Sequence, residues 1–113
     1  MEIKFKRMSD NVKSPYKANP GDAGYDLYVH AIEWRNDGMQ VCYHTGIAVE
    51  IPEGYVGLLY MRSSAVHKTC RMANATGVVD SGYRGEITAV FDILGHGNLY
   101  REGDRCCQLV IMP

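Results

Sequence analysis

The sequence has no long apolar run and no strong excess of charge of either sign. None of its apolar stretches approaches the roughly 20 residues that a membrane helix needs. The N-terminus MEIKFKRMSD also lacks the apolar stretch of a secretory signal. A formal net charge of −1 disfavours binding of nucleic acid through a broad basic face. We therefore expect a cytosolic protein that binds neither a membrane nor nucleic acid.

Spacings typical of metal ligands are missing as well. The four cysteines show no C-x-x-C pattern, and the adjacent Cys106 and Cys107 cannot easily bridge to each other. No two of the cysteines and the four histidines are spaced as zinc-ligand pairs usually are. We interpret the cysteines as reduced core thiols and keep a zinc site as a weaker alternative.

The hydrophobic pattern is mostly that of β-strands. Apolar and polar residues alternate in several runs, and turn-forming residues separate these runs. A chain of 113 residues is long enough for one domain with a modest core. The sequence predicts an all-β sandwich or barrel with one short helix, which lies within residues 63–72 and is capped by Ser63 or Ser64. Strands are expected near residues 3–6, 25–31, 39–43, 47–51, 55–61, 86–93 and 106–112.

One segment, GVVDSGYRGEI at residues 77–87, has the composition of a ligand-binding β-hairpin. It places the Asp80 carboxylate between an apolar strand and a glycine-flanked aromatic turn. Such a hairpin can present backbone N–H and C=O groups to a flat ligand and direct an acid and an aromatic ring at the same point. This pattern is typical of a site that recognises a nucleobase.

Three further segments carry polar groups, each with a simpler structural interpretation. In AGYDLY, Asp26 lies on the opposite strand face from its apolar neighbours, as an ordinary solvated carboxylate would. RSS, residues 62–64, places an arginine and two hydroxyls where the predicted helix begins, which suits either an anion site or a plain helix cap. GDRCCQLVI brings Arg105 and Gln108 beside a core strand, as a plain hairpin corner also would.

In this order and at these separations, AGYDLY, RSS, GVVDSGYRG and GDRCCQL resemble the first four motifs of the trimeric dUTP pyrophosphatase (dUTPase) family. The resemblance runs from about residue 18 to the end and implies a single dUTPase-like domain. It implies a distorted β-barrel or jelly-roll-like sandwich and a homotrimer whose sites are shared between subunits. It also implies Mg²⁺-assisted hydrolysis of dUTP to dUMP and pyrophosphate, which limits uracil incorporation into DNA and supplies dUMP for dTMP synthesis.

The resemblance also implies roles for individual residues. Asp80 would be the general base that takes a proton from the water attacking the α-phosphorus. Tyr83 would pack under the sugar and exclude a 2′-hydroxyl. Uracil and deoxyribose would be held mainly by backbone groups and by one side-chain amide, at Asn74, Gly77, Val78, Val79, Tyr83 and Thr88.

For the triphosphate, the resemblance implies that Ser63 and Ser64 hold the α and β phosphates and that Gln108 adds a neutral donor. Arg62 and Arg105 would either touch phosphate or pair with a carboxylate such as Asp104. Mg²⁺ would be held by the triphosphate and by water, with no direct protein ligand. Asp26 would then act indirectly, by ordering the waters of the metal or the hairpin.

The chain departs from the family pattern at two places. Ser64 and Ala65 stand where Gly and Leu are usual, and RSS also resembles dCTP deaminases of the same fold. Those enzymes carry a glutamate on the strand after the hairpin, where this chain has Val90. The printed sequence ends at Pro113, before the glycine-rich tail with an Arg and a Phe that usually closes over the nucleotide.

Two explanations of that ending stay open. Either the tail lies outside the printed residues, or the protein lacks it and catalysis is weakened. A non-catalytic protein that binds nucleotide and serves regulation is therefore a third hypothesis, beside the hydrolase and the deaminase. Asp80 and Tyr83 argue against it, because a protein that has lost turnover does not need a general base or a ring that excludes a 2′-hydroxyl.

Overall fold

The computed structural model describes residues 2–113, which form ten β-strands and one 3₁₀ helix. No helix in this range is both long and apolar enough to cross a membrane. The strands are β1 (Lys4–Arg7), β2 (Tyr25–Tyr28), β3 (Ala31–Arg35), β4 (Gln40–His44), β5 (Ile47–Glu50), β6 (Val56–Met61), β7 (Cys70–Met72), β8 (Gly77–Val79), β9 (Thr88–Ile93) and β10 (Arg105–Met112), and the 3₁₀ helix spans Ser63–His67.

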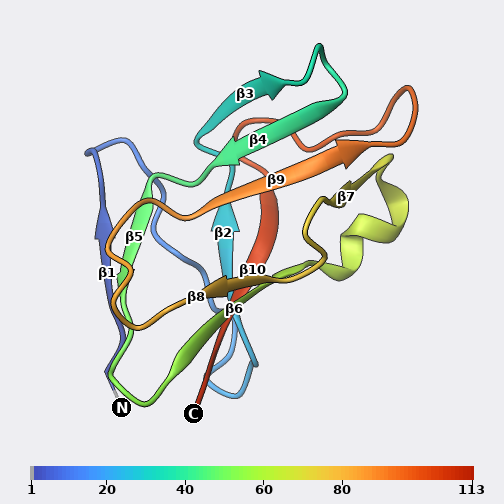
Figure 1. The fold of residues 1–113 in the computed structure, drawn as a ribbon. Helices are drawn as coiled ribbons and strands as arrows, with labels where there is room; N and C mark the ends of the chain where they lie inside the picture. The colour runs from blue at the N-terminus through green and yellow to red at the C-terminus, as the bar shows by residue number, and fades with distance from the viewer. Residues whose placement is uncertain (1) are drawn as a thin grey trace.

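Two four-stranded antiparallel sheets and a two-stranded ribbon make up the architecture. The first sheet has the order β2-β10-β6-β8, the second β3-β4-β9-β7, and β1 pairs with β5. Figure 1 shows the sheets crossing, with both chain ends at the same end of the molecule. The predicted all-β fold is confirmed.

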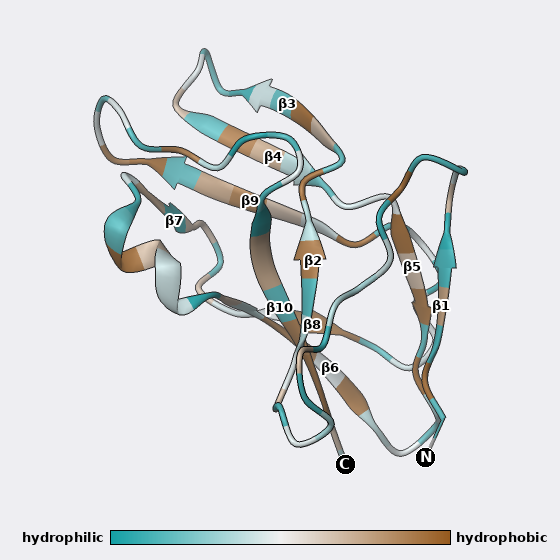
Figure 2. Ribbon diagram, turned by 180° about the vertical axis from the view of Figure 1, so that it is seen from behind, coloured by the Kyte–Doolittle hydropathy of each residue, from teal (hydrophilic) through white to brown (hydrophobic). Residues whose placement is uncertain are grey.

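The core lies between the two four-stranded sheets. Leu27, Leu59 and Leu109 enter it from the first sheet, and Tyr43 and Phe91 from the second. The Tyr43 and Phe91 rings meet edge to face with their centroids 5.4 Å apart, a favoured arrangement of aromatic rings. Figure 2 shows hydrophobic residues along β5, while β1 on the outside is mainly hydrophilic.

The predicted alternation along residues 86–93 is confirmed, since Ile87, Ala89 and Phe91 are all buried. Two other expectations are wrong in detail. Met39, predicted to alternate into the core, is 65% exposed because it lies in the β3–β4 turn. The strand β6, predicted to be covered on both faces, buries Leu59 but leaves its neighbour Leu58 half-buried in the single chain.

All four cysteines are free and buried, as predicted. Cys106 and Cys107 are adjacent in β10, yet both are fully buried. A shift in the register of β10 against β2, between Arg105 and Cys107, accounts for this, because a β-bulge interrupts the usual alternation of side chains. Their Sγ atoms lie 3.6 Å apart.

The segment 77–87 is not a regular hairpin, and this corrects the prediction. Its first arm, β8, pairs with β6 in the first sheet, whereas β9 pairs with β4 and β7 in the second. The return arm is held by the β4–β5 connection, where Ile87 N–H donates to Ile47 O at 2.8 Å and Thr45 Oγ1 donates to Ile87 O at 2.6 Å. The two arms therefore diverge, and a cavity opens between them.

The predicted helix is shorter than expected and is capped differently. It is a 3₁₀ helix that begins after Arg62, which has extended backbone angles, and no side chain caps its start. The Arg71 side chain donates to the carbonyls of Ala65, Lys68 and Cys70 at 2.7–3.0 Å. These bonds satisfy the carbonyls that a longer helix would use, and the chain turns into β7 instead.

Candidate functional site

The residues predicted to hold the base and sugar lie around one cavity, here named the β8–β9 cavity. Its volume is about 240 Å³, and it opens between the two arms of the segment 77–87. All six residues predicted for base and sugar line it. The lining residues are Leu59, Asn74, Gly77, Val78, Val79, Tyr83, Glu86, Ile87, Thr88 and Val90.

Unpaired backbone groups face this cavity. The strand β8 lies at the edge of its sheet, so one row of its N–H and C=O groups has no partner strand. In β9, the neighbour β7 pairs only with residues 91–93, which leaves that side of Thr88 free of a strand partner. Such edges can donate to and accept from a planar ligand, as they do when an extra strand adds to a sheet.

Gly77 allows a close approach at the wall of the cavity. A Cβ atom added at this position would lie 3.1 Å from Leu59 Cβ, which is tighter than ordinary contact. The Asn74 amide nitrogen would lie 3.7 Å from the same point. The Asn74 side chain is therefore beside the bare backbone of β8, where it offers both a donor and an acceptor.

The Tyr83 ring is held at the mouth of the cavity by the backbone of its own turn. Its hydroxyl donates to Glu86 O at 2.7 Å, and 46% of the residue is exposed. A Cβ atom on Gly85 would lie 2.7 Å from the Tyr83 hydroxyl oxygen. Glycine at position 85 therefore makes room for the ring in this position.

Asp80 is the first residue after β8 and is exposed. Its carbonyl accepts from Tyr83 N–H at 3.0 Å, which forms the turn that carries the ring back toward the cavity. Within residues 2–113 its carboxylate accepts no hydrogen bond. The carboxylate is thus free to meet water or a ligand beside the cavity.

The charged residues of the prediction gather around a second cavity, here named the arginine cavity. Its volume is about 330 Å³. Asp26 Oδ1 accepts from Arg62 Nε at 3.1 Å, and Asp26 Oδ2 lies 3.4 Å from Arg105 Nη1. The cavity is lined by Tyr28, Arg62, Ser64, Lys68, Tyr100, Gly103, Asp104 and Arg105.

Both arginines therefore pair with Asp26 and not with Asp104, the partner that the sequence suggested. The Asp104 carboxylate accepts instead from the backbone N–H of Arg101 at 2.8 Å, within its own turn. The side chain of Asp26 is 20% exposed, so it is not the solvated strand carboxylate that its position alone would indicate. Two guanidinium groups share one carboxylate, which leaves excess positive charge at the cavity.

The two hydroxyls of RSS lie in different surroundings. Ser64 Oγ accepts from Arg62 Nη1 at 3.3 Å and lies 2.9 Å from the Tyr100 hydroxyl, whereas Ser63 is exposed and does not line the cavity. Gln108 Nε2 donates to Met61 O at 3.3 Å. Gln108 lines neither cavity, although it sits opposite Asp26 in the sheet.

The length of β6 separates Asp80 from the arginine cavity. Val79 pairs with Gly57 near the start of this strand, so Asp80 lies at that end, while Arg62 follows its last residue. The six residue steps from Val56 to Arg62, of about 3.3 Å each, place Asp80 and Arg62 about 20 Å apart. In one chain, Asp80 and the arginine cavity cannot act on the same phosphate group.

Neither cavity contains a group of three potential metal ligands from residues 2–113. The one such group in that range is Glu33, Cys42 and His44, whose ligand atoms lie within 4.8 Å of one another. Arg35 already contacts both oxygens of Glu33, at 2.9 and 3.3 Å, and a guanidinium there opposes a second cation. The donor set around the arginine cavity fits a cation held through phosphate oxygens and water, with Asp104 on the wall of the cavity and Asp26 behind its two arginines.

Three residues at the cavities were missed by the sequence reasoning. Glu86 lines the β8–β9 cavity, and Lys68 and Tyr100 line the arginine cavity. Glu86 lies in the segment 77–87 and Lys68 in the predicted helix region 63–72, so their position in sequence next to the motifs is the signal that could have found them. No sequence signal marks Tyr100, which depends on the fold to reach Ser64.

The fold and the two cavities define an all-β protein with a backbone-lined pocket and a separate cationic site. The model of the dUTPase family matches residues 10–113, and the chain belongs to that family. It is similar to the deoxyuridine 5'-triphosphate nucleotidohydrolases of Rhodococcus erythropolis, at 38% identity over 98% of this chain and 70% of the relative, and of Nocardia farcinica, at 39% over 96% and 68%.

Solved structures with the same fold include dUTPases of bacteriophages. A mutant dUTPase of phage phi11 of S. aureus, described with a structural Mg(II) ion, matches with a TM-score of 0.81 at 27% identity, over 100% of this chain and 91% of the other. A mutant dUTPase of Staphylococcus bacteriophage 80alpha, described with dUpNHpp, matches with a TM-score of 0.82 at 25% identity, over 99% and 90%. The predicted family is thereby confirmed.

Proposed function

We propose that this chain hydrolyses dUTP to dUMP and pyrophosphate, as a dUTP diphosphatase. The observation that carries the proposal is the β8–β9 cavity, which brings together all six residues expected to hold uracil and deoxyribose. Membership of the dUTPase family supports it. In a cell, this activity would limit uracil incorporation into DNA and supply dUMP for dTMP synthesis.

Base recognition would rest on the free edges of β8 and β9 and on Asn74. Uracil presents alternating acceptors and a donor along one edge, and these strands offer backbone groups of both kinds. Cytosine places an amino group where uracil has a carbonyl, so it would leave a buried protein donor unpaired and bind more weakly. The Tyr83 ring, held by Glu86 O, would then crowd a 2′-hydroxyl and select deoxyribose.

Hydrolysis would begin with the Asp80 carboxylate accepting a proton from water. The water oxygen forms a bond to the α-phosphorus, the bridging bond from that phosphorus to the β-phosphate oxygen breaks, and pyrophosphate leaves. The free, exposed carboxylate of Asp80 suits this step, because a general base must be within hydrogen-bond reach of the water it deprotonates. Ser64, Arg62 and Lys68 would hold the phosphate chain.

Mg²⁺ would be held mainly by the triphosphate, with Asp26 reaching it through water. When bound, it would neutralise charge on the phosphate oxygens. The paired arginines keep the Asp26 carboxylate fixed in place, each from one side. Asp26 would thus contribute to the site by ordering the water bound to Mg²⁺, although it does not approach Asp80.

A complete site would require more than one copy of the chain. Because Asp80 and Arg62 lie about 20 Å apart in one chain, Asp80 of one copy and the arginine cavity of another must combine. A homotrimer with three equivalent shared interfaces provides this arrangement by symmetry. Half-buried apolar residues such as Leu58 on the outer face of β6 would gain burial in such an assembly.

The proposal is tested by measuring pyrophosphate release from dUTP and Mg²⁺. Asp80→Asn should lower kcat by about a hundredfold to ten-thousandfold, the usual contribution of general base catalysis. Asp37→Asn is the matched control, because Asp37 lies in the exposed β3–β4 turn with a φ of 54° that asparagine tolerates. Turnover of dUTP by the wild-type protein is expected, and its absence would overturn the proposal.

The same assay separates the runner-up activities. Release of ammonia from dCTP would favour the deaminase, although Val90 lines the cavity where that enzyme needs a glutamate. Tight binding of dUpNHpp without any turnover of dUTP would favour a regulatory nucleotide-binding protein. Release of pyrophosphate alone, lost in Asp80→Asn, supports the hydrolase.

A further inference from the structure

We infer that His44 is a positioning residue for the β8–β9 cavity, because its ring holds Glu86 and, through Glu86, the Tyr83 ring in place for nucleotide binding. The inference rests on the proposed function, since it takes this cavity as the site of dUTP. His44 is the last residue of β4 and touches neither the expected base nor the phosphates. It would act only through Glu86.

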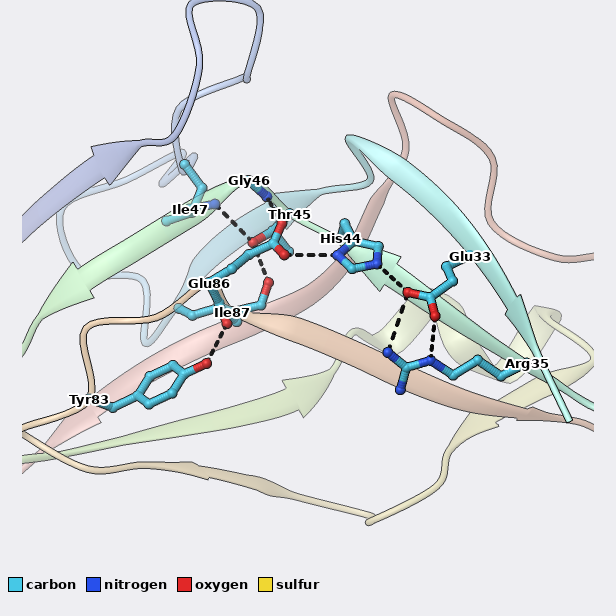
Figure 3. A network of polar contacts seen from close by, with 9 residues as sticks. All are labelled: Glu33, Arg35, His44, Thr45, Gly46, Ile47, Tyr83, Glu86 and Ile87. Atoms are coloured by element: carbon cyan, nitrogen blue, oxygen red, sulfur yellow. Dashed lines mark hydrogen bonds and ion pairs between the residues drawn. The ribbon is translucent and has the colours of Figure 1, made fainter.

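The His44 ring lies between two carboxylates, as Figure 3 shows. Nδ1 is 2.8 Å from Glu86 Oε1, and Nε2 is 2.7 Å from Glu33 Oε1. An ionised carboxylate only accepts hydrogen bonds, so both ring nitrogens must donate, and only the charged imidazolium can do that. Arg35 donates to both oxygens of Glu33. Arg35, Glu33, His44 and Glu86 therefore form one continuous series of hydrogen bonds, here named the His44 row.

The charged groups around the ring stabilise this state. The hydrogen bonds to Glu86 and then to Glu33 raise the pKa of His44. The other titratable group on the same face is Cys42, whose pKa is raised by burial, so its thiol adds no competing charge. Arg35 faces Glu33, while His30 contacts His44 only through its backbone and lines another cavity.

Glu86 connects this ring to the cavity wall. Its second carboxylate oxygen, Oε2, accepts from Gly46 N–H at 2.9 Å, and its backbone carbonyl accepts from the Tyr83 hydroxyl at 2.7 Å. Glu86, Tyr83 and Thr88 all line the β8–β9 cavity. If His44 loses its charge, one ring N–H remains for two carboxylates. The bond to Glu86 is then shared with the alternative bond to Glu33 and has lost its charge assistance, so the carbonyl that holds Tyr83 becomes less restrained.

The sign of the pH effect follows from the raised pKa of His44. The imidazolium bridge is complete at and below the ordinary histidine range, and it is lost as the pH rises through the raised value. Thr45 and Gly46 still hold the return arm when the charge is gone, so the fold persists. Nucleotide affinity should therefore weaken on the alkaline side while the protein stays folded.

The test is the affinity for dUpNHpp, measured by calorimetry from about pH 6 to about pH 9, a range that spans histidine titration. Wild-type affinity should fall by roughly three- to tenfold across this range, as expected for the loss of one partly exposed, charge-assisted hydrogen bond. His44→Gln should bind weakly throughout, with a flat pH profile. His44→Lys, which keeps its charge over this range, should bind as the wild type does at low pH and should also be flat.

His96→Gln is the matched control, because His96 lies in an exposed turn away from both cavities, and it should retain the wild-type slope. With dUTP as substrate, His44→Gln should raise KM and leave kcat unchanged, since Asp80 is held by β8 and not by Glu86. Equal slopes for the wild type and both His44 variants would overturn the inference.

Failure of the proposed function is distinguishable from failure of this inference. If the wild type does not bind dUpNHpp at any pH, the cavity assignment itself is wrong. If it binds but His44→Lys keeps the wild-type slope, only the role of His44 is wrong. Should His44→Gln not fold, the comparison of His44→Lys with the wild type still decides the question.

Discussion

The two ends of β6 carry opposite kinds of surface. At its start, the β8–β9 cavity is lined by small, apolar and backbone groups, with Glu86 as its one charged side chain. At its end, the arginine cavity has three cations, Arg62, Lys68 and Arg105, and one acid, Asp104, along its wall. The first surface suits a neutral planar base and the second suits phosphate, so one nucleotide needs both kinds.

The two regions are also assembled differently. Residues 77–88 of the β8–β9 cavity are nearly contiguous, so a single motif of the sequence contains most of the site. The arginine cavity depends on the register of three strands, because β10 places Arg105 beside Tyr28 of β2 and Cys107 beside Met61 of β6, the residue before Arg62. Local sequence determines the first region, and long-range strand pairing determines the second.

The strongest test of this separation is complementation between copies. Arg62→Met should lower kcat by about a hundredfold or more, because it removes a charged donor from the phosphate site. Copies carrying Arg62→Met, mixed equally with copies carrying Asp80→Asn, should regain activity at about a quarter of their sites if each site joins two subunits at random. The measurement is pyrophosphate release by the re-associated mixture.

A matched mixture sharpens this result. Arg62→Met mixed with Arg105→Met damages the same cavity in every copy, so no site regains a complete set of arginines. This mixture should stay inactive. Activity in the first mixture that does not exceed the sum of the separate variants would show that Asp80 and Arg62 act within one chain, against the geometry of β6.

A smaller effect is expected at Asp26, the carboxylate that both arginines of the arginine cavity contact. Asp26→Asn leaves two guanidinium groups without their shared countercharge, and the free energy of unfolding should fall by about 1–2 kcal/mol. Asp104→Asn is the control, since an asparagine oxygen can still accept from Arg101 N–H. Chemical denaturation of both variants measures the difference, and equal losses would mean that Asp26 does not hold the arginines.

The contrast between the two regions also explains how far the sequence could predict the structure. Alternation placed Ile87, Ala89 and Phe91 in the core, and the segment 77–87 supplies six of the ten residues that line the β8–β9 cavity. The pairing of Arg62 with Asp26 was not predictable, because 36 residues separate them and only strand register brings them together.

Two errors have a common physical cause. The segment 77–87 was predicted as a regular hairpin because a glycine turn between apolar runs favours one. In the structure, β6 and the β4–β5 connection satisfy the backbone groups of the two arms separately. The helix after Arg62 was likewise shortened by competition for its carbonyls, here from the Arg71 side chain, which donates to Ala65 O and Lys68 O. Competition from side chains and from other strands for the same backbone groups is invisible to local pattern reasoning.

Within the β8–β9 cavity, two glycines of one turn offer a finer test. Gly85→Ala should displace the Tyr83 ring, because the new Cβ would lie 2.7 Å from the hydroxyl oxygen and 2.8 Å from Cζ. The preference for dUTP over UTP, as a ratio of kcat/KM values, should fall by about five- to tenfold. Gly82→Ala is the control, since no atom lies within 4 Å of its added Cβ. Equal ratios for the two variants would show that Tyr83 does not sort the sugar.

The smallest expected effect is on the pH dependence of unfolding, at Glu33, which contacts His44 on the side of the ring away from Glu86. Hydrogen bonds from Arg35 and then His44 lower the pKa of Glu33 to about 2, so its stabilising contribution is complete above the ordinary glutamate range. That contribution is lost as the pH falls from about 4.5 toward about 2. Glu33→Gln should therefore flatten the acid side of the unfolding curve, whereas Glu53→Gln, in the exposed β5–β6 turn, should not. Thermal unfolding as a function of pH measures both, and parallel curves for the wild type and Glu33→Gln would mean that the row behind the β8–β9 cavity contributes no electrostatic restraint.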